Sequence, residues 1–291
     1  MALAVDARLL VSCVGGAVAA WVALSCVGDD PSPGSTASVD GGVIDASPAT
    51  DAEGPSESDG GATAVCPDAA ILCDDFESGD FRRWEGPPIA EAPSRLDVDS
   101  LGPPRRGSFG LHFATERNEV DGAIVRTSAR LRSKAFDEVT AGTLAVRFYM
   151  LAPTVPSQAT TLFWFSKGPQ DGAVSVLYVE QGKWAAQSVG GTIDGATFAP
   201  SAVAIASNRW TCVEWVVDVG VAGRQQIFLD GSPAPVLVSE MDTVGSTARG
   251  YAHGSFLMNN QGPASQHLFF DDVVLATFAG RAEGPRIGCG P

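Results

Sequence analysis

The sequence lacks several features that would indicate common classes of protein. No segment repeats its apolar residues with the helical period of 3.6, which argues against a helical fold. No Cys-x-x-Cys motif or neighbouring histidine supports a zinc site. Basic residues are scarce: 19 Lys and Arg stand against 34 Asp and Glu, a net charge of −15 in 291 residues. Such an acidic chain repels phosphate backbones, so nucleic acid is not an expected partner.

Residues 1–26 have the layout of a secretory signal peptide. Arg8 precedes an apolar run, residues 9–26, that small residues interrupt. Its last four residues, Ala-Leu-Ser-Cys, resemble a bacterial lipobox, although the motif usually begins with Leu. We therefore expect lipidation at Cys26 and an exported lipoprotein of the outer membrane or cell surface, held at the membrane by its lipid alone. Ordinary cleavage with secretion, and an uncleaved anchor, are the alternatives.

Residues 27–65 differ in composition from the rest of the chain. They contain eight acids and no Lys or Arg, with almost no large apolar side chain. Such a segment cannot bury enough surface to offset the entropy of ordering it, so we expect a disordered acidic tether. The remainder, residues 66–291, has the length of one all-β domain.

From residue 66 onward the chain consists of short apolar runs separated by Gly, Pro, Asn and Asp. Thr143–Met150 and Trp210–Val219 alternate with the two-residue period of a strand, and Asp230-Gly231 is typical of a hairpin turn. Further expected strands are Gly110–Ala114, Gly122–Leu131, Thr160–Ser166, Ala173–Glu180, Lys183–Val189, Arg224–Leu229, Val236–Val238, Ser255–Met258 and His267–Thr277. About a dozen short strands spaced by turns predict an all-β fold, a two-sheet antiparallel β-sandwich.

Four cysteines of the domain can form disulfides if the chain is exported. Cys66, Cys73, Cys212 and Cys289 allow three pairings. Cys66 and Cys73 bracket a loop of six residues, which is easily closed. The sequence therefore predicts the bridge Cys66–Cys73, and a second bridge, Cys212–Cys289, that ties the C-terminus to a strand.

Two segments, Cys73–Asp80 and Leu268–Leu275, place adjacent acids among aromatic and β-branched residues. Acids are depleted in strands and costly to bury unpaired, so we expect these two strands to lie side by side. Together with Trp84, Gly142–Met150, Trp210–Trp215 and Leu229–Gly231, they resemble the laminin-G/concanavalin A-like superfamily over roughly residues 70–280, and its exported bacterial lipoproteins in particular. The resemblance implies a jelly roll but marks no activity.

The resemblance also implies a structural Ca²⁺ ion between the first and last strands. Oxygen ligands suit this ion, and Asp75, Glu77 and Asp272 are the expected ligands. The alternative is that these acids accept hydrogen bonds from loop amides or pair with arginines: Arg82, Arg83 or Arg147.

Lectins and other sugar-binding proteins share the implied fold, and flat tryptophan rings can stack on sugars. We expect Trp164 and Trp184 to be exposed platforms, with His253 and Asn260 as polar contacts, and Trp84 and Trp215 to be core residues. The expected function is a non-catalytic glycan-binding or adhesion module on the bacterial surface, with a polysaccharide as partner.

Two alternatives involve catalysis, and one involves no sugar. A lyase would use the polar segment 249–261, although the alginate-lyase motifs are absent. A glycosidase would use Glu214 and Asp218, which share a strand face but lack the usual third acid. The last alternative is a structural or protein-binding lipoprotein of the cell envelope.

Overall fold

The computed structural model describes ten stretches of the chain: residues 66–100, 105–116, 118–120, 123–125, 127–168, 174–189, 197–243, 250–260, 264–280 and 286–289. The expected signal peptide, Cys26 and the tether lie outside these residues, as do residues 249 and 261 of the polar segment. Within the described stretches, no helix has the length and apolar character needed to cross a membrane.

All regular secondary structure in the described stretches is β-strand. The strands are β1 (Ala70–Asp74), β2 (Ile89–Ala90), β3 (Arg95–Asp99), β4 (Gly110–Thr115), β5 (Asn118–Val120), β6 (Ala123–Val125), β7 (Thr127–Arg132), β8 (Gly142–Leu151), β9 (Thr160–Ser166), β10 (Val174–Glu180), β11 (Lys183–Val189), β12 (Thr197–Ala204), β13 (Thr211–Val219), β14 (Gly223–Leu229), β15 (Leu237–Met241), β16 (His253–Asn260) and β17 (Gln266–Phe278).

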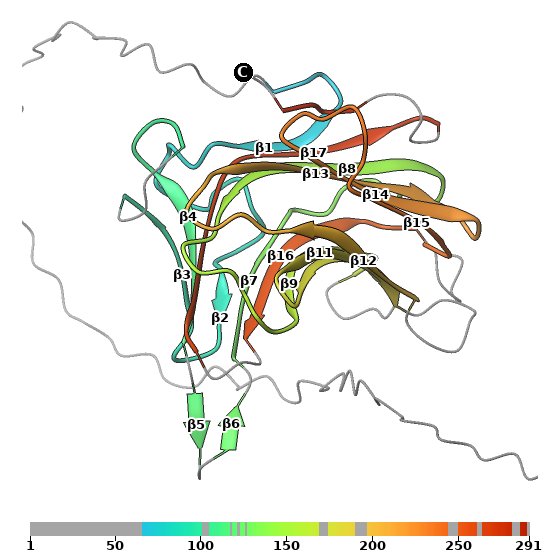
Figure 1. Ribbon diagram of the computed structural model, residues 1–291. Coiled ribbons are helices and arrows are strands. Elements are labelled where there is room, and N and C mark those ends of the chain that lie inside the picture. Colours follow the sequence, from blue (N-terminus) through green and yellow to red (C-terminus); the bar gives the residue numbers. More distant parts are fainter. Residues whose placement is uncertain are drawn as a thin grey trace, which may run out of the picture. The chain divides into compact units, whose positions relative to one another are not determined.

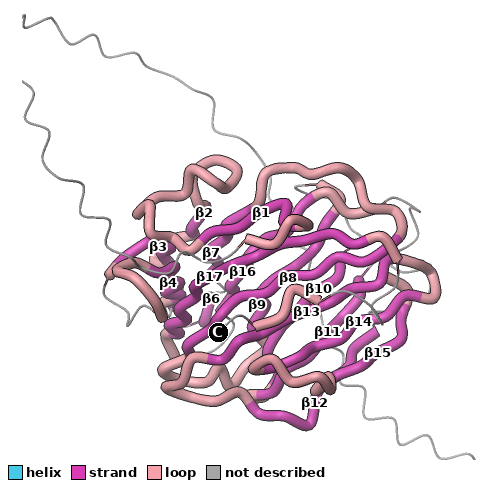
Figure 2. The backbone as a smooth tube through the Cα atoms, turned by 90° about the horizontal axis from the view of Figure 1, so that it is seen from above, coloured by secondary structure: helices cyan, strands magenta, loops and turns pink. Residues whose placement is uncertain are grey.

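Two antiparallel sheets lie face to face (Figure 1). The eight-stranded sheet has the order β15-β14-β13-β8-β17-β4-β3, with β1 added beside β17 (Figure 2). The seven-stranded sheet has the order β12-β11-β10-β9-β16-β7-β2, and β5 pairs with β6 separately. The all-β, two-sheet antiparallel sandwich predicted from the sequence is confirmed.

Alternation along the strands decides which side chains fill the space between the sheets. On β8, Val146 and Phe148 belong to the core, while Arg147 and Tyr149 point to the other side of the sheet. Trp215 on β13 is fully buried in the same core, as the sequence predicts. Each large apolar side chain removed from water in this way contributes about 1.5–3 kcal/mol.

Phe256 on β16 lies at the centre of an aromatic cluster that joins the two sheets. Its ring centroid lies 5.5 Å from that of Phe148 and 4.7 Å from that of Phe270, both on the eight-stranded sheet. Phe163, from the neighbouring strand β9, lies edge-on at 5.0 Å, and Trp84 lies at 5.9 Å. One continuous core therefore holds both sheets.

The first and last strands pair, as the acids in them suggested. Cys73 on β1 lies opposite Val274 on β17, and Asp74 lies opposite Val273. The buried Asp74 carboxylate accepts a 2.7 Å hydrogen bond from Trp84 Nε1. Burial raises the pKa of Asp74, while the bond from Trp84 lowers it in part. The indole therefore shares this buried acid with the Phe76 amide, which donates to Asp74 Oδ1 at 3.1 Å, and with Arg83, whose Nε lies 4.0 Å away.

Both expected disulfides are present, Cys66–Cys73 and Cys212–Cys289. The second attaches residues 286–289, which we call the C-terminal strap, to β13 in the eight-stranded sheet. Disulfides persist in oxidising compartments, so this pair indicates an exported protein.

Candidate functional site

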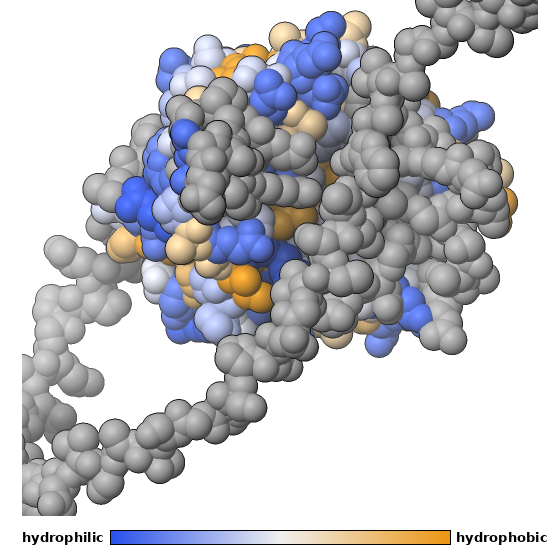
Figure 3. All heavy atoms as spheres, turned by 90° about the horizontal axis from the view of Figure 1, so that it is seen from below, coloured by the Kyte–Doolittle hydropathy of each residue, from blue (hydrophilic) through white to orange (hydrophobic). Residues whose placement is uncertain are grey.

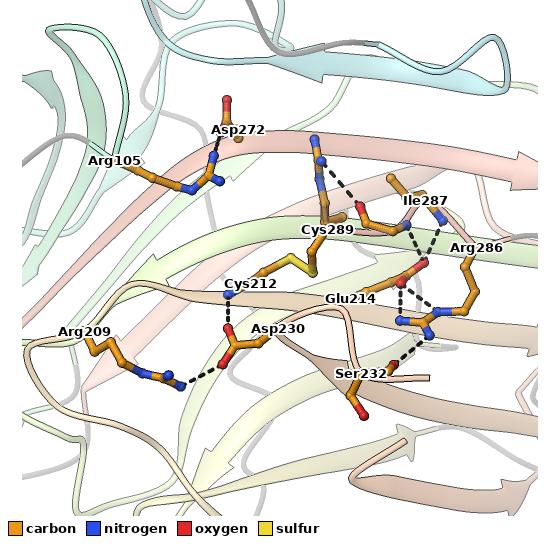
Figure 4. Close-up of a disulfide and its surroundings, with 12 residues drawn as sticks. Arg105, Arg209, Cys212, Glu214, Asp230, Ser232, Asp272, Arg286, Ile287 and Cys289 are labelled. Atoms are coloured by element: carbon orange, nitrogen blue, oxygen red, sulfur yellow. Dashed lines mark hydrogen bonds and ion pairs between the residues drawn. A yellow bond between two sulfur atoms is a disulfide. The ribbon is translucent and has the colours of Figure 1, made fainter. Parts of the chain in front are cut away.

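Each sheet has an outer face that points away from the core, and the two outer faces differ. On the eight-stranded sheet the C-terminal strap contacts Glu214, which is 0 % exposed (Figure 4). Arg286 Nε donates to Glu214 Oε2 at 2.9 Å, and the amide of Ile287 donates to Oε1 at 2.7 Å. Both carboxylate oxygens are thus occupied by the strap.

Asp218, the other half of the possible glycosidase pair, is also engaged. It accepts a 3.0 Å hydrogen bond from Thr143 Oγ1 and forms an ion pair with Arg224 at 3.4 Å. The geometry therefore assigns Glu214 and Asp218 to structural contacts and gives no support to a catalytic pair.

The adjacent acids of β17 bind the loop that precedes β4. Asp271 Oδ2 accepts hydrogen bonds from the amides of Arg105, at 3.1 Å, and Arg106, at 3.3 Å. Asp272 forms an ion pair with the Arg105 guanidinium (Figure 4). The same guanidinium lies over the ring of Tyr149. Burial, followed by the charge of Asp272, raises the pKa of Asp271 to about 7.

The other two expected calcium ligands have different partners. Glu77 accepts hydrogen bonds from the amides of Ser108, at 2.9 Å, and Phe109, at 3.0 Å. Asp75 accepts a long one from the amide of Glu77, at 3.4 Å. The described residues include no group of three or more His, Cys, Asp or Glu arranged to hold a metal ion. Calcium at Asp75, Glu77 and Asp272 stays a prediction, and the contacts fit the loop-amide alternative better.

The outer face of the seven-stranded sheet carries a mixed row of side chains across five strands. Trp164 on β9 lies opposite Val176 on β10, which lies opposite Gln187 on β11. In the other direction, Trp164 lies opposite Ser255 on β16, which lies opposite Arg132 on β7. Figure 3 views the molecule from this side and shows hydrophilic and hydrophobic residues close together.

A second row lies further along the same face. Tyr178 on β10 lies opposite Thr161 on β9. The Asn259 side chain, from β16, accepts from the Thr161 amide at 3.4 Å and donates to its hydroxyl at 3.3 Å. Burial raises the pKa of Tyr178, and the nearby charge of Glu180 raises it further.

Trp164 combines an apolar and a polar surface on this face. Its half-buried ring packs against Val176, Tyr178 and Ala185. Among the described residues its Nε1 has no hydrogen-bond partner, and neither does the Oγ of the fully buried Ser255 on the neighbouring strand. Both atoms are shielded from solvent, so a ligand on this face would meet the partly exposed side chain of Trp164 rather than these two atoms.

Trp184 is not an exposed platform, contrary to the sequence-based expectation. It is 0 % exposed and lies in the core between the sheets. The reason is its position on β11, where Trp184 and Ala186 point inward while Ala185, one residue on, packs beside Trp164 on the outer face. Neighbouring side chains of a strand point to opposite faces, so a shift of one residue moves a side chain from the outer face to the core.

His253 does lie on the outer face, but its surroundings are ionic. It is buried, with Nδ1 lying 3.7 Å from Glu85 Oε2. The same carboxylate oxygen lies 2.6 Å from Arg132 Nε. The two groups form an ion pair, but the N–H···O angle is not that of a hydrogen bond. Arg130, two residues earlier on β7, lies on the same side.

Within the described part of the polar segment, Tyr251 does not converge with His253. Tyr251 is buried in the core side of the sheet, where its hydroxyl lies 2.8 Å from Ser175 Oγ. Asn260 pairs with Thr127 through the β16–β7 ladder, and its side chain lies outside the described part of the structure. The lyase arrangement expected within segment 249–261 is therefore not supported.

Sequence reasoning missed four side chains of the outer face: Arg130, Arg132, Tyr178 and Ser255. The alternation of polar and apolar residues in Ser128–Arg132 was a usable signal, since it places both arginines on one face. No signal in the sequence shows which strands would lie beside β7.

The fold class is that of a two-sheet antiparallel β-sandwich, and comparisons with known proteins bear on the fold alone. No protein-family model matches the chain, and no curated protein matches it in sequence. Solved structures do. The endo-β-1,4-glucuronan lyase from the fungus Trichoderma reesei is 12% identical, with a TM-score of 0.57 over 72% of this chain and 96% of the lyase. The cellulose induced protein Cip1 is 17% identical, with a TM-score of 0.55 over 75% of this chain and 100% of Cip1.

Proposed function

We propose that this protein is a non-catalytic glycan-binding or adhesion module, and that the outer face of its seven-stranded sheet binds the glycan. The observation that carries the proposal is the partly exposed side chain of Trp164 on that face, an indole that packs against Val176, Tyr178 and Ala185. A sugar ring stacked on an indole buries apolar C–H groups, and its hydroxyls can both accept and donate hydrogen bonds.

The neighbouring groups suit the same kind of ligand. The partly exposed Gln187, two strands across from Trp164, adds an amide side chain to the face. Structural similarity to a glucuronan lyase and to a cellulose induced protein supports a polysaccharide as the ligand class, by analogy of fold.

A polysaccharide lyase is the second candidate, because Tyr178, His253 and arginines share the outer face. Two observations favour binding over catalysis. The raised pKa of Tyr178 disfavours the phenolate that a general base requires. Furthermore, His253 lies opposite Ser166, which lies opposite Val174, so it is two strands across and four residues along from Tyr178. Strand geometry then separates the two Cα atoms by roughly 17 Å.

The setting that we propose is the surface of a bacterium. The two disulfides support export. Membrane attachment through lipid at Cys26, with the acidic segment 27–65 as a tether, would hold the module away from the lipid surface. We also propose that the protein belongs to the concanavalin A-like superfamily.

The test is binding of the purified protein to an array of polysaccharides and oligosaccharides, followed by titration of the glycans that bind. We expect Trp164→Ala to lower the affinity at least tenfold. Trp164→Phe, which keeps a ring but removes the N–H group, should have an intermediate effect. Trp210→Ala, which removes a partly buried tryptophan at the start of β13, is the matched control and should bind like wild type.

Two results would overturn the proposal. The first is an array on which no glycan binds to protein that melts cooperatively. The second is glycan binding that Trp164→Ala leaves unchanged. Release of unsaturated sugars, measured through the ultraviolet absorbance of their new double bond, would favour the lyase candidate over the binding module.

A further inference from the structure

Arg130 is a cation on the proposed binding face that forms no close ion pair with another described residue. It is half-buried on β7, and no hydrogen bond joins it to another described residue. Burial lowers its pKa and the adjacent charge of Arg132 lowers it further, while the charge of Glu85 raises it in part. A guanidinium that has lost part of its hydration gains strongly from an anion that can reach it.

The nearby acids on this face are engaged elsewhere. The Glu85 carboxylate forms the ion pair with Arg132. Glu91, beside the other end of β7, accepts a 2.8 Å hydrogen bond from Ser128 Oγ. No hydrogen bond or close ion pair with a described residue occupies the Arg130 guanidinium, which points to an anion supplied from outside the chain.

The position of Arg130 relative to Trp164 defines the size of that ligand. Arg130 lies opposite Leu257 on β16, while Trp164 lies opposite Ser255 on the same strand. Arg130 is therefore two strands across and two residues along from Trp164, roughly 12 Å between Cα atoms. One sugar ring stacked on Trp164 is too small to reach Arg130 as well, whereas an oligosaccharide can contact both.

We infer that the glycan is acidic, and that Arg130 binds the carboxylate of a uronic acid residue in a chain that also stacks on Trp164. This inference rests on the proposed glycan-binding function and adds the chemical class of the ligand. The planar guanidinium matches a carboxylate through two parallel N–H···O bonds, which lysine cannot make. Binding at a partly buried site also reduces screening by salt.

The experiment compares oligouronides with their carboxyl-reduced forms, which keep the linkages and ring shapes but carry no charge. Affinities for wild type, Arg130→Gln and Arg130→Lys are measured by titration calorimetry. We expect wild type to prefer the oligouronide at least tenfold, and Arg130→Gln to bind both forms with similar affinity. Arg130→Lys should retain only part of the preference. Arg95→Gln, which removes an exposed arginine at the edge of the other sheet, should keep the full preference.

The outcomes separate the two proposals. If wild type binds the oligouronides and their reduced forms equally well, the acidic-glycan inference is wrong while glycan binding stands. A preference that survives in Arg130→Gln would place the carboxylate elsewhere and overturn the role of Arg130. If neither form binds, and no other glycan on the array does, the proposed function itself fails.

Discussion

Asp271 and Asp272 show how one strand can bury two neighbouring acids. The β17 ladder changes register between Asp271 and Val274, and Asp272 has a positive φ of 49°. This irregularity takes both residues out of strict alternation, so that the first acid reaches two loop amides and the second reaches Arg105. The local strain is offset by charge-assisted hydrogen bonds at both carboxyl groups.

The raised pKa of Asp271 predicts a pH dependence of stability. The folded-state pKa of about 7 exceeds the ordinary value of 3.8. The contribution of Asp271 to stability is therefore fully present below pH 4 and is lost as the pH rises through 7, because the unfolded chain ionises more readily. We expect Asp271→Asn to flatten the decline of melting temperature between about pH 4 and 7, the interval between the two pKa values, measured by circular dichroism.

The slope is a better measurement than the melting temperature itself. Asparagine lacks one of the two acceptor oxygens of Asp271, so the variant will lose stability at every pH. Asp97→Asn, which changes an exposed acid of β3, provides the control and should keep the wild-type slope. An unchanged slope in Asp271→Asn would mean that this carboxyl group titrates normally in the folded protein.

At the scale of elements, the sequence predicted strands well and their partners less well. Alternation in β8 and β13 identified inward residues such as Val146 and Trp215, because burial on one face imposes a two-residue period. The pairing of β1 with β17 followed from the cost of burying acids. Trp184 was assigned wrongly because an isolated tryptophan in a mostly small-residue strand does not indicate which face is covered.

The outer-face site could not be predicted for a related reason. Its row from Gln187 to Arg132 crosses five strands, and β7 and β16 are far apart in the sequence. Strand order is determined by packing of the whole sandwich, so no local pattern brings Ser255 beside Trp164. The acids of β17 were recognised as needing partners, yet Arg105 became their partner through the fold of a loop that carries no periodic signal.

The two disulfides predict unequal losses of stability. The sequence separation is 77 residues for Cys212–Cys289 and 7 for Cys66–Cys73. Loop-closure entropy then gives about 4.5 kcal/mol for the long bridge and about 2.4 kcal/mol for the short one. Release of the C-terminal strap would also leave Glu214 buried without Arg286, which adds to the first loss.

The measurement is urea unfolding of two paired variants. Cys212→Ser with Cys289→Ser should lose at least 2 kcal/mol more than Cys66→Ser with Cys73→Ser, by the difference between the two loop-closure terms. Each pair serves as the control for the other, since both remove two sulfur atoms and one covalent bond. Equal losses would contradict the dependence on loop length, whereas a difference of only about 2 kcal/mol would show that the strap contributes nothing beyond a closed loop.

At the scale of the whole molecule, one core joins the two sheets. A disulfide attaches the C-terminal strap to the eight-stranded sheet, and we propose that the seven-stranded sheet binds a ligand. The C-terminal strap contacts the eight-stranded sheet through Glu214, and the candidate site lies on the outer face of the seven-stranded sheet. Side chains on that face are held by strands rather than by loops, so a ligand would meet preorganised groups. We therefore expect little change in backbone structure when a glycan binds.

The last prediction concerns cooperativity, because a single core should make the two sheets unfold together. Phe256 contacts aromatic rings from both sheets, including Phe148, Phe163 and Phe270, and is 0 % exposed. Phe256→Ala should lower the free energy of unfolding by about 3–5 kcal/mol through lost burial and a cavity. Val238→Ala, at a side chain that is 51% exposed, is the control and should change it by less than about 0.5 kcal/mol. Sheet content and tryptophan fluorescence should follow one transition in wild type and variant alike, as expected for two-state unfolding. Two separated transitions would instead mean that each sheet is stable without the other, and that Phe256 stabilises only the seven-stranded sheet to which it belongs.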